Sequence, residues 1–221
     1  CGAFKIYSEW PLTSKGLMYD RNWMIVTSNG VCLTQKTNTK LCLIQANILL
    51  THNVLELTYP NFDAIRIPLL ASDTESNLSL SLCQSKVCGD RIEGIDCGDT
   101  VAEWLTNVLS MPKLRLMRQS LNDKRHLKKT IQGKPPQAIS LANQAQFLLI
   151  NTASVDWLTH NVKEWNTLDT SHNKTLNNVI DRFRANIIVE TENPFDELTW
   201  TSIQFGNVKL TCEGLCTRCQ M

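Results

Sequence analysis

Apolar and polar residues alternate over much of the first half of the chain, as expected for β-strands. Two β-prone runs, residues 24–28 and 31–35, flank Asn29-Gly30. Asn-Gly between such runs indicates a tight hairpin, because a type I′ turn needs two consecutive residues at positive φ. Further apolar or alternating runs occupy residues 41–50, 54–57 and 64–68. Residues 1–97 are therefore predicted to be mainly β.

One helix is predicted after this β-rich region. Thr100-Val-Ala-Glu103 has the spacing of a capping box, in which the first and fourth residues satisfy each other's backbone N–H groups. Apolar positions three and four apart follow, namely Trp104, Leu105, Val108 and Leu109. The helix of about ten residues ends before Met111-Pro112, since the residue before a proline disfavours the helical conformation. Just upstream, Gly94 in Glu93-Gly-Ile-Asp96 predicts a turn, which makes those two acids structural.

The pattern of residues 136–221 mixes helices and strands. The predicted elements are an apolar run at 147–150, helices near 154–162 and 176–183, a strand at 187–190, and a hairpin that pairs 199–205 with 208–211. The whole chain is thus predicted to be α+β, mostly β.

A basic stretch separates the two halves. Residues 113–129 contain seven Lys or Arg and one Asp, and Gly133-Lys-Pro-Pro136 follows, a sequence that regular elements do not tolerate. We interpret residues 113–135 as a basic linker between modules at 1–112 and 136–221. Such a stretch is either a solvated loop or a binding surface for an anionic partner, and charge alone does not decide between them.

Composition narrows the class of protein. The chain has 221 residues, of which 43% are hydrophobic and 19% charged, with a formal net charge of +1. This excludes a disordered chain, and no apolar run approaches the ~18 residues that a transmembrane helix needs. The charge balance gives no reason to expect nucleic acid or a membrane surface as a partner.

The cysteines argue for a reducing compartment. There are nine of them, an odd number, and no signal peptide opens the chain. We interpret the thiols as reduced and the protein as cytoplasmic. Because the chain starts at Cys1 and stops at Met221, soon after a cysteine cluster, we expect a fragment of a longer protein.

That cluster, Cys212-Glu-Gly-Leu-Cys216-Thr-Arg-Cys219, is the densest set of soft ligands in the sequence. Its spacing fits an iron-sulfur site, a structural zinc site that lacks a fourth ligand, or a reactive thiolate favoured by the adjacent Arg218. Three inert cysteines at the end of a strand are the remaining alternative. Serine-histidine-aspartate arrangements and glycine-rich phosphate loops, the usual signatures of other enzymes, do not appear in a convincing context.

Two arginines are candidates for anion binding. Arg21 and Arg184 lie among aromatic and apolar residues, where an unpaired guanidinium is costly to bury. Asp20 or Asp181 could pair with them, or together they could form a phosphate site. Asn186 offers a donor and an acceptor suited to a heterocycle edge, although asparagine after a helix is as often a cap or turn residue.

The order of these motifs resembles the MOSC family, in particular the C-terminal part of the molybdenum cofactor sulfurases. The resemblance rests on residues 1–4, 16–23, the Asn-Gly hairpin with 33–35, 41–45, 96–98, 147–151, 182–187 and 216–220. The related amidoxime-reducing components usually have proline where this chain has Ala185, which favours the sulfurase branch. The resemblance implies a β-barrel-like MOSC N-terminal module over 1–112 and a β-rich MOSC domain over 136–221 that is incomplete at its C-terminal end.

The resemblance also implies a site and a cofactor. The family binds Mo-molybdopterin, the molybdenum cofactor, and Cys219 matches the cysteine that approaches the metal and acts as the catalytic thiol. The residues that match its cofactor contacts are Arg21, Asn143, Gln144, Arg184, Asn186, Thr217, Arg218 and Cys219.

The implied activity is that of a sulfurtransferase. A pyridoxal phosphate desulfurase domain, N-terminal to this part of the protein, supplies a persulfide. The sulfurated cofactor then activates xanthine dehydrogenase and aldehyde oxidase. We expect this fragment alone to be inactive, to have an unpaired edge in its final sheet and to bind the cofactor weakly. The alternatives are a molybdenum-dependent amidoxime-type reductase and a zinc-stapled interaction domain without enzymatic activity.

Overall fold

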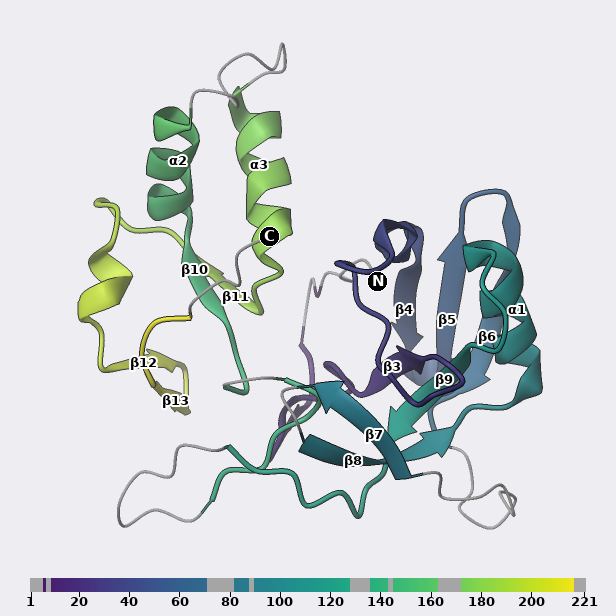
Figure 1. Ribbon diagram of the computed structural model, residues 1–221. Helices are drawn as coiled ribbons and strands as arrows, with labels where there is room; N and C mark the ends of the chain where they lie inside the picture. The colour runs from purple at the N-terminus through teal and green to yellow at the C-terminus, as the bar shows by residue number, and fades with distance from the viewer. Residues whose placement is uncertain are drawn as a thin grey trace. The chain divides into compact units, whose positions relative to one another are not determined.

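The computed structural model describes residues 6, 9–70, 82–87, 90–127, 136–142, 145–162 and 172–216. The chain forms two compact units, Cys1–Gln144 and Ala145–Met221, each of which is traced in Figure 1.

Unit 1 is built on two antiparallel sheets. The four-stranded sheet has the order β3 (Trp23–Val26), β9 (Arg115–Gln119), β8 (Asp90–Asp96) and β7 (Leu82–Val87). The three-stranded sheet has the order β4 (Gln45–Leu49), β5 (Val54–Tyr59) and β6 (Phe62–Pro68). A short pair, β1 (Leu12–Thr13) and β2 (Gly16–Leu17), precedes them, and short 3-10 helices cover Thr39–Leu43 and Leu50–His52.

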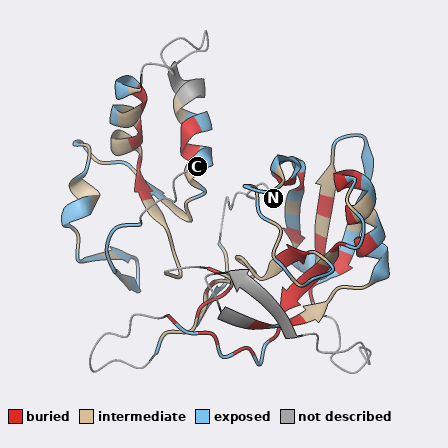
Figure 2. Ribbon diagram, in the orientation of Figure 1, coloured by how far each residue is buried: buried red, intermediate tan, exposed pale blue. Residues whose placement is uncertain are grey.

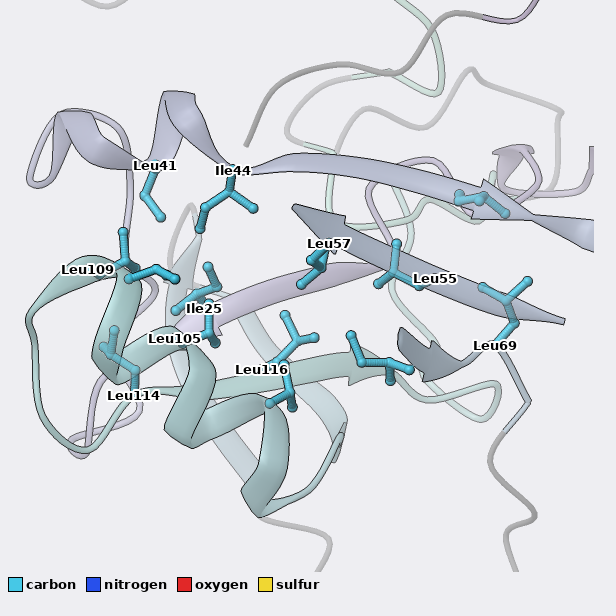
Figure 3. Close-up of a cluster of buried hydrophobic side chains, with 14 residues drawn as sticks. Ile25, Leu41, Ile44, Leu55, Leu57, Leu69, Leu105, Leu109, Leu114 and Leu116 are labelled. Carbon is cyan, nitrogen blue, oxygen red and sulfur yellow. The ribbon is translucent and has the colours of Figure 1, made fainter. Parts of the chain in front are cut away.

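Helix α1 (Asp99–Leu109) buries one face in unit 1. Its buried positions, Val101, Leu105, Val108 and Leu109 among them, lie three or four residues apart, which is the spacing of one side of a helix. They join a core with residues from both sheets, including Ile25, Leu55, Leu57 and Leu116, as Figure 3 shows. The predicted helix is confirmed: it ends at Leu109, and the following Ser110 takes the left-handed conformation.

A tight turn is present at Asn29-Gly30, but it is not the expected type I′ turn, because Asn29 is not at positive φ and the Gly30 N–H donates to the carbonyl of Thr27 (2.9 Å). Thr27 donates its backbone N–H to the carbonyl of Val31 (3.0 Å), and Gly30 has a φ of 71°. The second run pairs with β3 only through the bridge between Val26 and Cys32. The prediction of a turn between Glu93 and Asp96 is wrong, because these residues lie inside β8. Gly94 instead packs closely against Met117, whose Cε would lie 3.4 Å from an added Cβ.

The part of the predicted basic linker that the structure describes is not a solvated loop. Residues 115–119 form β9, between β3 and β8, with Leu116, Met117, Arg118 and Gln119 all buried. Arg118 donates to the carbonyl of Leu69, so its guanidinium has a hydrogen-bond partner inside the unit. Residues 113–127 therefore belong to the folded body of unit 1.

Unit 2 pairs two parallel strands and packs helices against each other. β10 (Leu149–Asn151) runs parallel to β11 (Ile187–Val189). Helices α2 (Thr152–Asn161) and α3 (His172–Phe183) lie between them in the sequence. The buried cluster is small and contains Ile150, Val155, Val179 and Ile180. The 3-10 helix η4 (Asp196–Thr199) and the hairpin of β12 (Ser202–Phe205) and β13 (Val208–Thr211) follow, and Figure 2 shows how much of this hairpin is exposed.

The predicted fold class is confirmed: the described elements are α+β and mostly β. Within the described strands, the two sheets of unit 1 share no member, so closure into a barrel stays an expectation. None of the helices in the described parts of the chain has the length and apolar character needed to cross a membrane.

Candidate functional site

Arg21 lies in the turn that joins β2 to β3. Tyr19 and Arg21 both have positive φ values, 65° and 51°, a conformation that non-glycine residues rarely adopt. The Arg21 guanidinium forms an ion pair with the Asp20 carboxylate, and the two side chains are 29% and 27% exposed. The pairing expected from the sequence is thus present, and the guanidinium remains within reach of an anion from solvent.

Arg184 lies at the junction between α3 and β11. Its backbone N–H donates to the carbonyl of Asp181 (3.2 Å), and its φ of 54° turns the chain out of the helix. The residue is exposed. A planar guanidinium at such a position can bind a phosphate through two parallel hydrogen bonds.

Asn186 connects this junction to β10. Its side-chain Oδ1 accepts a hydrogen bond from the backbone N–H of Leu148 (3.0 Å). Its own backbone N–H donates to the carbonyl of Leu148 (2.8 Å). The acceptor oxygen of Asn186 is therefore used within unit 2, which matches the structural alternative drawn from the sequence.

The described candidates fall into both units: Arg21 belongs to unit 1, and Arg184 and Asn186 belong to unit 2. The remaining candidates, Asn143, Gln144, Thr217, Arg218 and Cys219, lie outside the described residues. Cys212 and Cys216 are exposed. Within the described ranges, no group of three or more His, Cys, Asp or Glu could hold a metal ion.

Sequence reasoning did not foresee a buried polar network in unit 2. Asn151 is fully buried and caps α2 by accepting from the N–H of Ala153 (3.1 Å). Its side-chain NH₂ donates to Glu197 Oε2 (2.9 Å) and Thr191 Oγ1 (2.7 Å), and Ser154 donates to Glu197 Oε1 (2.7 Å). An asparagine directly before a helix is a signal for the cap, whereas its contact with Glu197 has no local signal.

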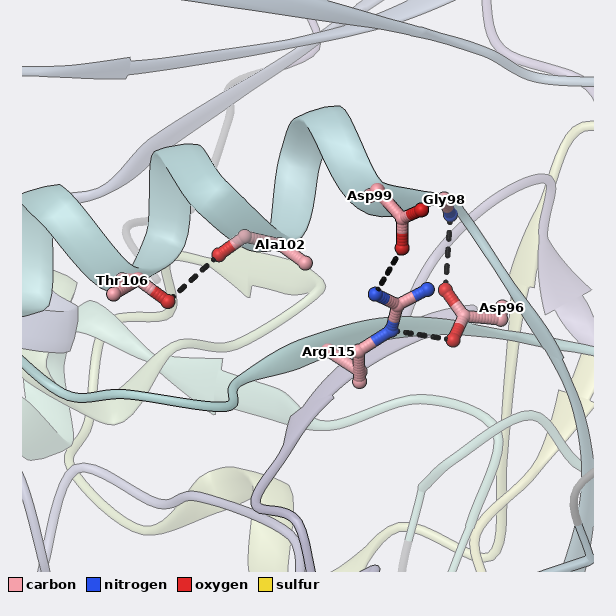
Figure 4. A network of polar contacts seen from close by, with 6 residues as sticks. All are labelled: Asp96, Gly98, Asp99, Ala102, Thr106 and Arg115. Carbon is pink, nitrogen blue, oxygen red and sulfur yellow. Dashed lines mark hydrogen bonds and ion pairs between the residues drawn. The ribbon is translucent and has the colours of Figure 1, made fainter.

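The Asp96-Cys-Gly98 motif also has a structural role. Arg115 Nε donates to Asp96 Oδ2 and its NH1 donates to Asp99 Oδ1, both at 2.6 Å, while Gly98 N–H donates to Asp96 Oδ1 (2.9 Å), as Figure 4 shows. The bond to Asp96 is the largest of several effects that raise the pKa of Arg115. These hydrogen bonds thus link the start of α1 to β9.

Burial disfavours the charged form of the Cys97 thiol. Burial raises its pKa from 9.0 to about 12, against the smaller lowering effect of Arg118. A thiol with such a pKa is protonated at neutral pH and is a poor nucleophile. Cys97 is therefore not a candidate for sulfur chemistry.

Comparison with known proteins now places these residues in a family. Residues 1–112 match the MOSC N-terminal beta barrel domain, and residues 136–221 match the MOSC domain. The chain belongs to the MOSC family.

The MOSC chain is similar over its whole length to several molybdenum cofactor sulfurases. It is 49% identical to the enzyme of Bombyx mori, and the match covers 100% of this chain and 26% of that protein. Molybdenum cofactor sulfurase 2 of Culex quinquefasciatus is 43% identical, covering 100% and 28%, and the Danio rerio protein is 42% identical, covering 100% and 26%. The chain spans about a quarter of the length of these relatives. A solution structure of a Bordetella bronchiseptica protein is 18% identical, with a TM-score of 0.38 over 53% of this chain and 91% of that chain.

The described residues fit an anionic cofactor. Arg184 is exposed and Arg21, paired with Asp20, is half-buried; both lie in turns with positive φ, and arginine is suited to phosphate. In the cysteine cluster, the described Cys212 follows β13 directly and donates its N–H to the carbonyl of Thr201 (2.9 Å).

Proposed function

We propose that this MOSC chain binds Mo-molybdopterin and is the acceptor part of a molybdenum cofactor sulfurtransferase. The observation that carries the proposal is the exposed Arg184 at the α3–β11 junction. The family resemblance matches this arginine, but not Arg182, to a cofactor contact. Similarity to molybdenum cofactor sulfurases over the whole chain supports the same assignment.

Each candidate residue has a chemical task in this proposal. Arg21 and Arg184 are each assigned to an anionic group of the pterin cofactor, because a guanidinium matches the charge and the oxygens of a phosphate. Asn186, whose Oδ1 is bonded to Leu148, sets the path of the main chain beside Arg184. Cys219 provides a thiolate for a thiophilic metal. The other contacts are assigned to Asn143, Gln144, Thr217 and Arg218.

The sulfur is supplied outside this chain. We infer a longer protein in which a pyridoxal phosphate desulfurase domain forms a persulfide on cysteine. If bound, the molybdenum cofactor would supply a thiophilic metal centre able to hold sulfur as a ligand. The recipients of the sulfurated cofactor are xanthine dehydrogenase and aldehyde oxidase, and the reaction takes place in the cytoplasm.

Two neighbouring arginines give a matched test. Arg182 and Arg184 are both exposed and lie two residues apart, so Arg182→Ala and Arg184→Ala remove the same charge from the same region. The longer protein is purified from a cofactor-producing host, and its pterin and molybdenum are measured per chain. Hydrogen bonds to a charged group contribute about 1.5–3 kcal/mol, so Arg184→Ala should lower retention by about tenfold or more.

Arg182→Ala should retain the cofactor as wild type does. Equal retention by all three proteins would contradict the role of Arg184, and equal losses in both variants would show that only the net charge of the region matters.

A further inference from the structure

Two hydrogen bonds from distant segments hold the main chain at Arg21. The backbone N–H of Leu141 donates to the carbonyl of Arg21 (3.0 Å), and the backbone N–H of Gln119 donates to the carbonyl of Asn22 (2.7 Å). These contacts lie in unit 1 and join the β2–β3 turn to the end of β9 and to residues 136–142. The left-handed conformation of Arg21 is unfavourable for its residue type, so it persists because such contacts fix it.

The side chain of Gln119 connects the same segments. It is only 3% exposed, and its Nε2 donates to Asp123 Oδ2 (2.7 Å) and to the carbonyl of Ile139 (3.2 Å). Asp123 is itself buried. The side-chain amide of Gln119 therefore links the loop after β9 to residues 136–142, which include Leu141.

Arg125 fixes the rest of that segment. Its side chain is 7% exposed, and its NH1 donates to the carbonyls of Ser140 (2.8 Å) and Ala142 (2.7 Å). The carbonyl of Arg125 in turn accepts from the N–H of Ile139 (3.1 Å). A buried guanidinium that bonds two carbonyls on either side of Leu141 holds the Leu141 N–H in place for Arg21.

We propose that Gln119 and Arg125 are positioning residues, which hold residues 139–142 so that Leu141 fixes the Arg21 turn for binding the anionic group of the cofactor. The inference rests on the proposed function and adds to it two residues that do not themselves touch the ligand. Both belong to the basic stretch that sequence reasoning assigned to a linker.

The first test measures how well the hydrogen bonds at the Arg21 turn are maintained in the absence of cofactor. Hydrogen exchange at the backbone amides of Gln119 and Leu141 is compared between wild type and Arg125→Ala. Exchange at both amides should rise in the variant, while the amides of β4–β6 stay protected, because those strands pair with one another in a separate sheet. Unchanged exchange at Leu141 would overturn the proposal.

The second test measures cofactor retention in the longer protein. Loss of a residue that orients a ligand-binding group typically costs 10–100-fold in affinity, so Arg125→Ala and Gln119→Leu should retain at least about tenfold less pterin than wild type. Arg125→Lys should restore part of the loss, since an ammonium group can donate to the same carbonyls. Leu55→Ala, a core change in β5, should lower the unfolding midpoint without a comparable loss of pterin.

The outcomes separate the two proposals. If Arg21→Ala loses the cofactor while Arg125→Ala and Gln119→Leu keep it, the positioning role is overturned and the proposed function stands. If wild type itself holds no pterin, the proposed function fails, and the positioning role for that ligand fails with it. If Leu55→Ala loses as much pterin as Arg125→Ala, the effect is general destabilisation and the positioning role is overturned.

Discussion

Arg21 and Arg184 share a backbone conformation that residues other than glycine rarely adopt. Their φ angles are 51° and 54°, and each arginine lies shortly before a strand, β3 or β11. Such a conformation costs of order 1 kcal/mol or more, so tertiary hydrogen bonds hold both turns. Each guanidinium is therefore carried by a fixed main chain, which reduces the entropy lost when an anion binds.

The sequence could identify these arginines but not their setting. A guanidinium among apolar residues needs an anion, and that argument uses only residue types. Neither residue is glycine or asparagine, so no local signal shows the positive φ. The bond from Leu148 N–H to Asn186 Oδ1 spans 38 positions, which no local pattern can predict.

The thiol of Cys97, a half-buried residue, predicts a pH dependence of stability. Burial raises its pKa from 9.0 to about 12 in the folded state. Between these values the unfolded chain loses the proton while the folded chain keeps it, so the free energy of unfolding falls as pH rises through this window. Urea unfolding at pH 8 and pH 10.5 should show a larger loss of stability for wild type than for Cys97→Ala. Parallel losses in the two proteins would refute the burial of this thiol.

At the scale of elements, β9 shows where pattern and packing disagree. Its charges made residues 113–129 look solvated, yet Arg115 bonds to Asp96 and Asp99 and Arg118 bonds to the carbonyl of Leu69. Those partners lie far away in the sequence, so the density of charged residues alone could not predict that β9 is buried. The Asn29-Gly30 turn and α1 were predictable because their signals are local.

A pair of leucines tests the burial of this element. Leu116 in β9 is 3% exposed, whereas Leu121, five positions on, is 77% exposed. Leu116→Ala should lower the free energy of unfolding by about 2–5 kcal/mol, and Leu121→Ala should change it by less than about 0.5 kcal/mol. Chemical denaturation of the two variants measures the difference. Similar small effects for both would mean that β9 is not part of the core.

At the scale of the whole molecule, the chain has one unit with an extensive core and one with a small core. Sequence reasoning divided the chain at residues 113–135, and those domain boundaries stay a prediction. The structure shows in addition that residues 136–142 bond to Arg125, Gln119 and Arg21 within unit 1. Main-chain carbonyls accept several of these bonds, and because every residue has one, the sequence does not reveal the contact.

The central claim is that the chain holds the molybdenum cofactor with Cys219 at the metal. The most direct measurement is the molybdenum and pterin content per chain of the longer protein, purified from a cofactor-producing host, with native Cys219 and as Cys219→Ser. The account predicts equimolar molybdenum and pterin in the wild type and loss of molybdenum, or of both, in the variant. Absence of both from the wild type, with zinc co-purifying instead, would contradict it and make the cysteine cluster a structural metal site.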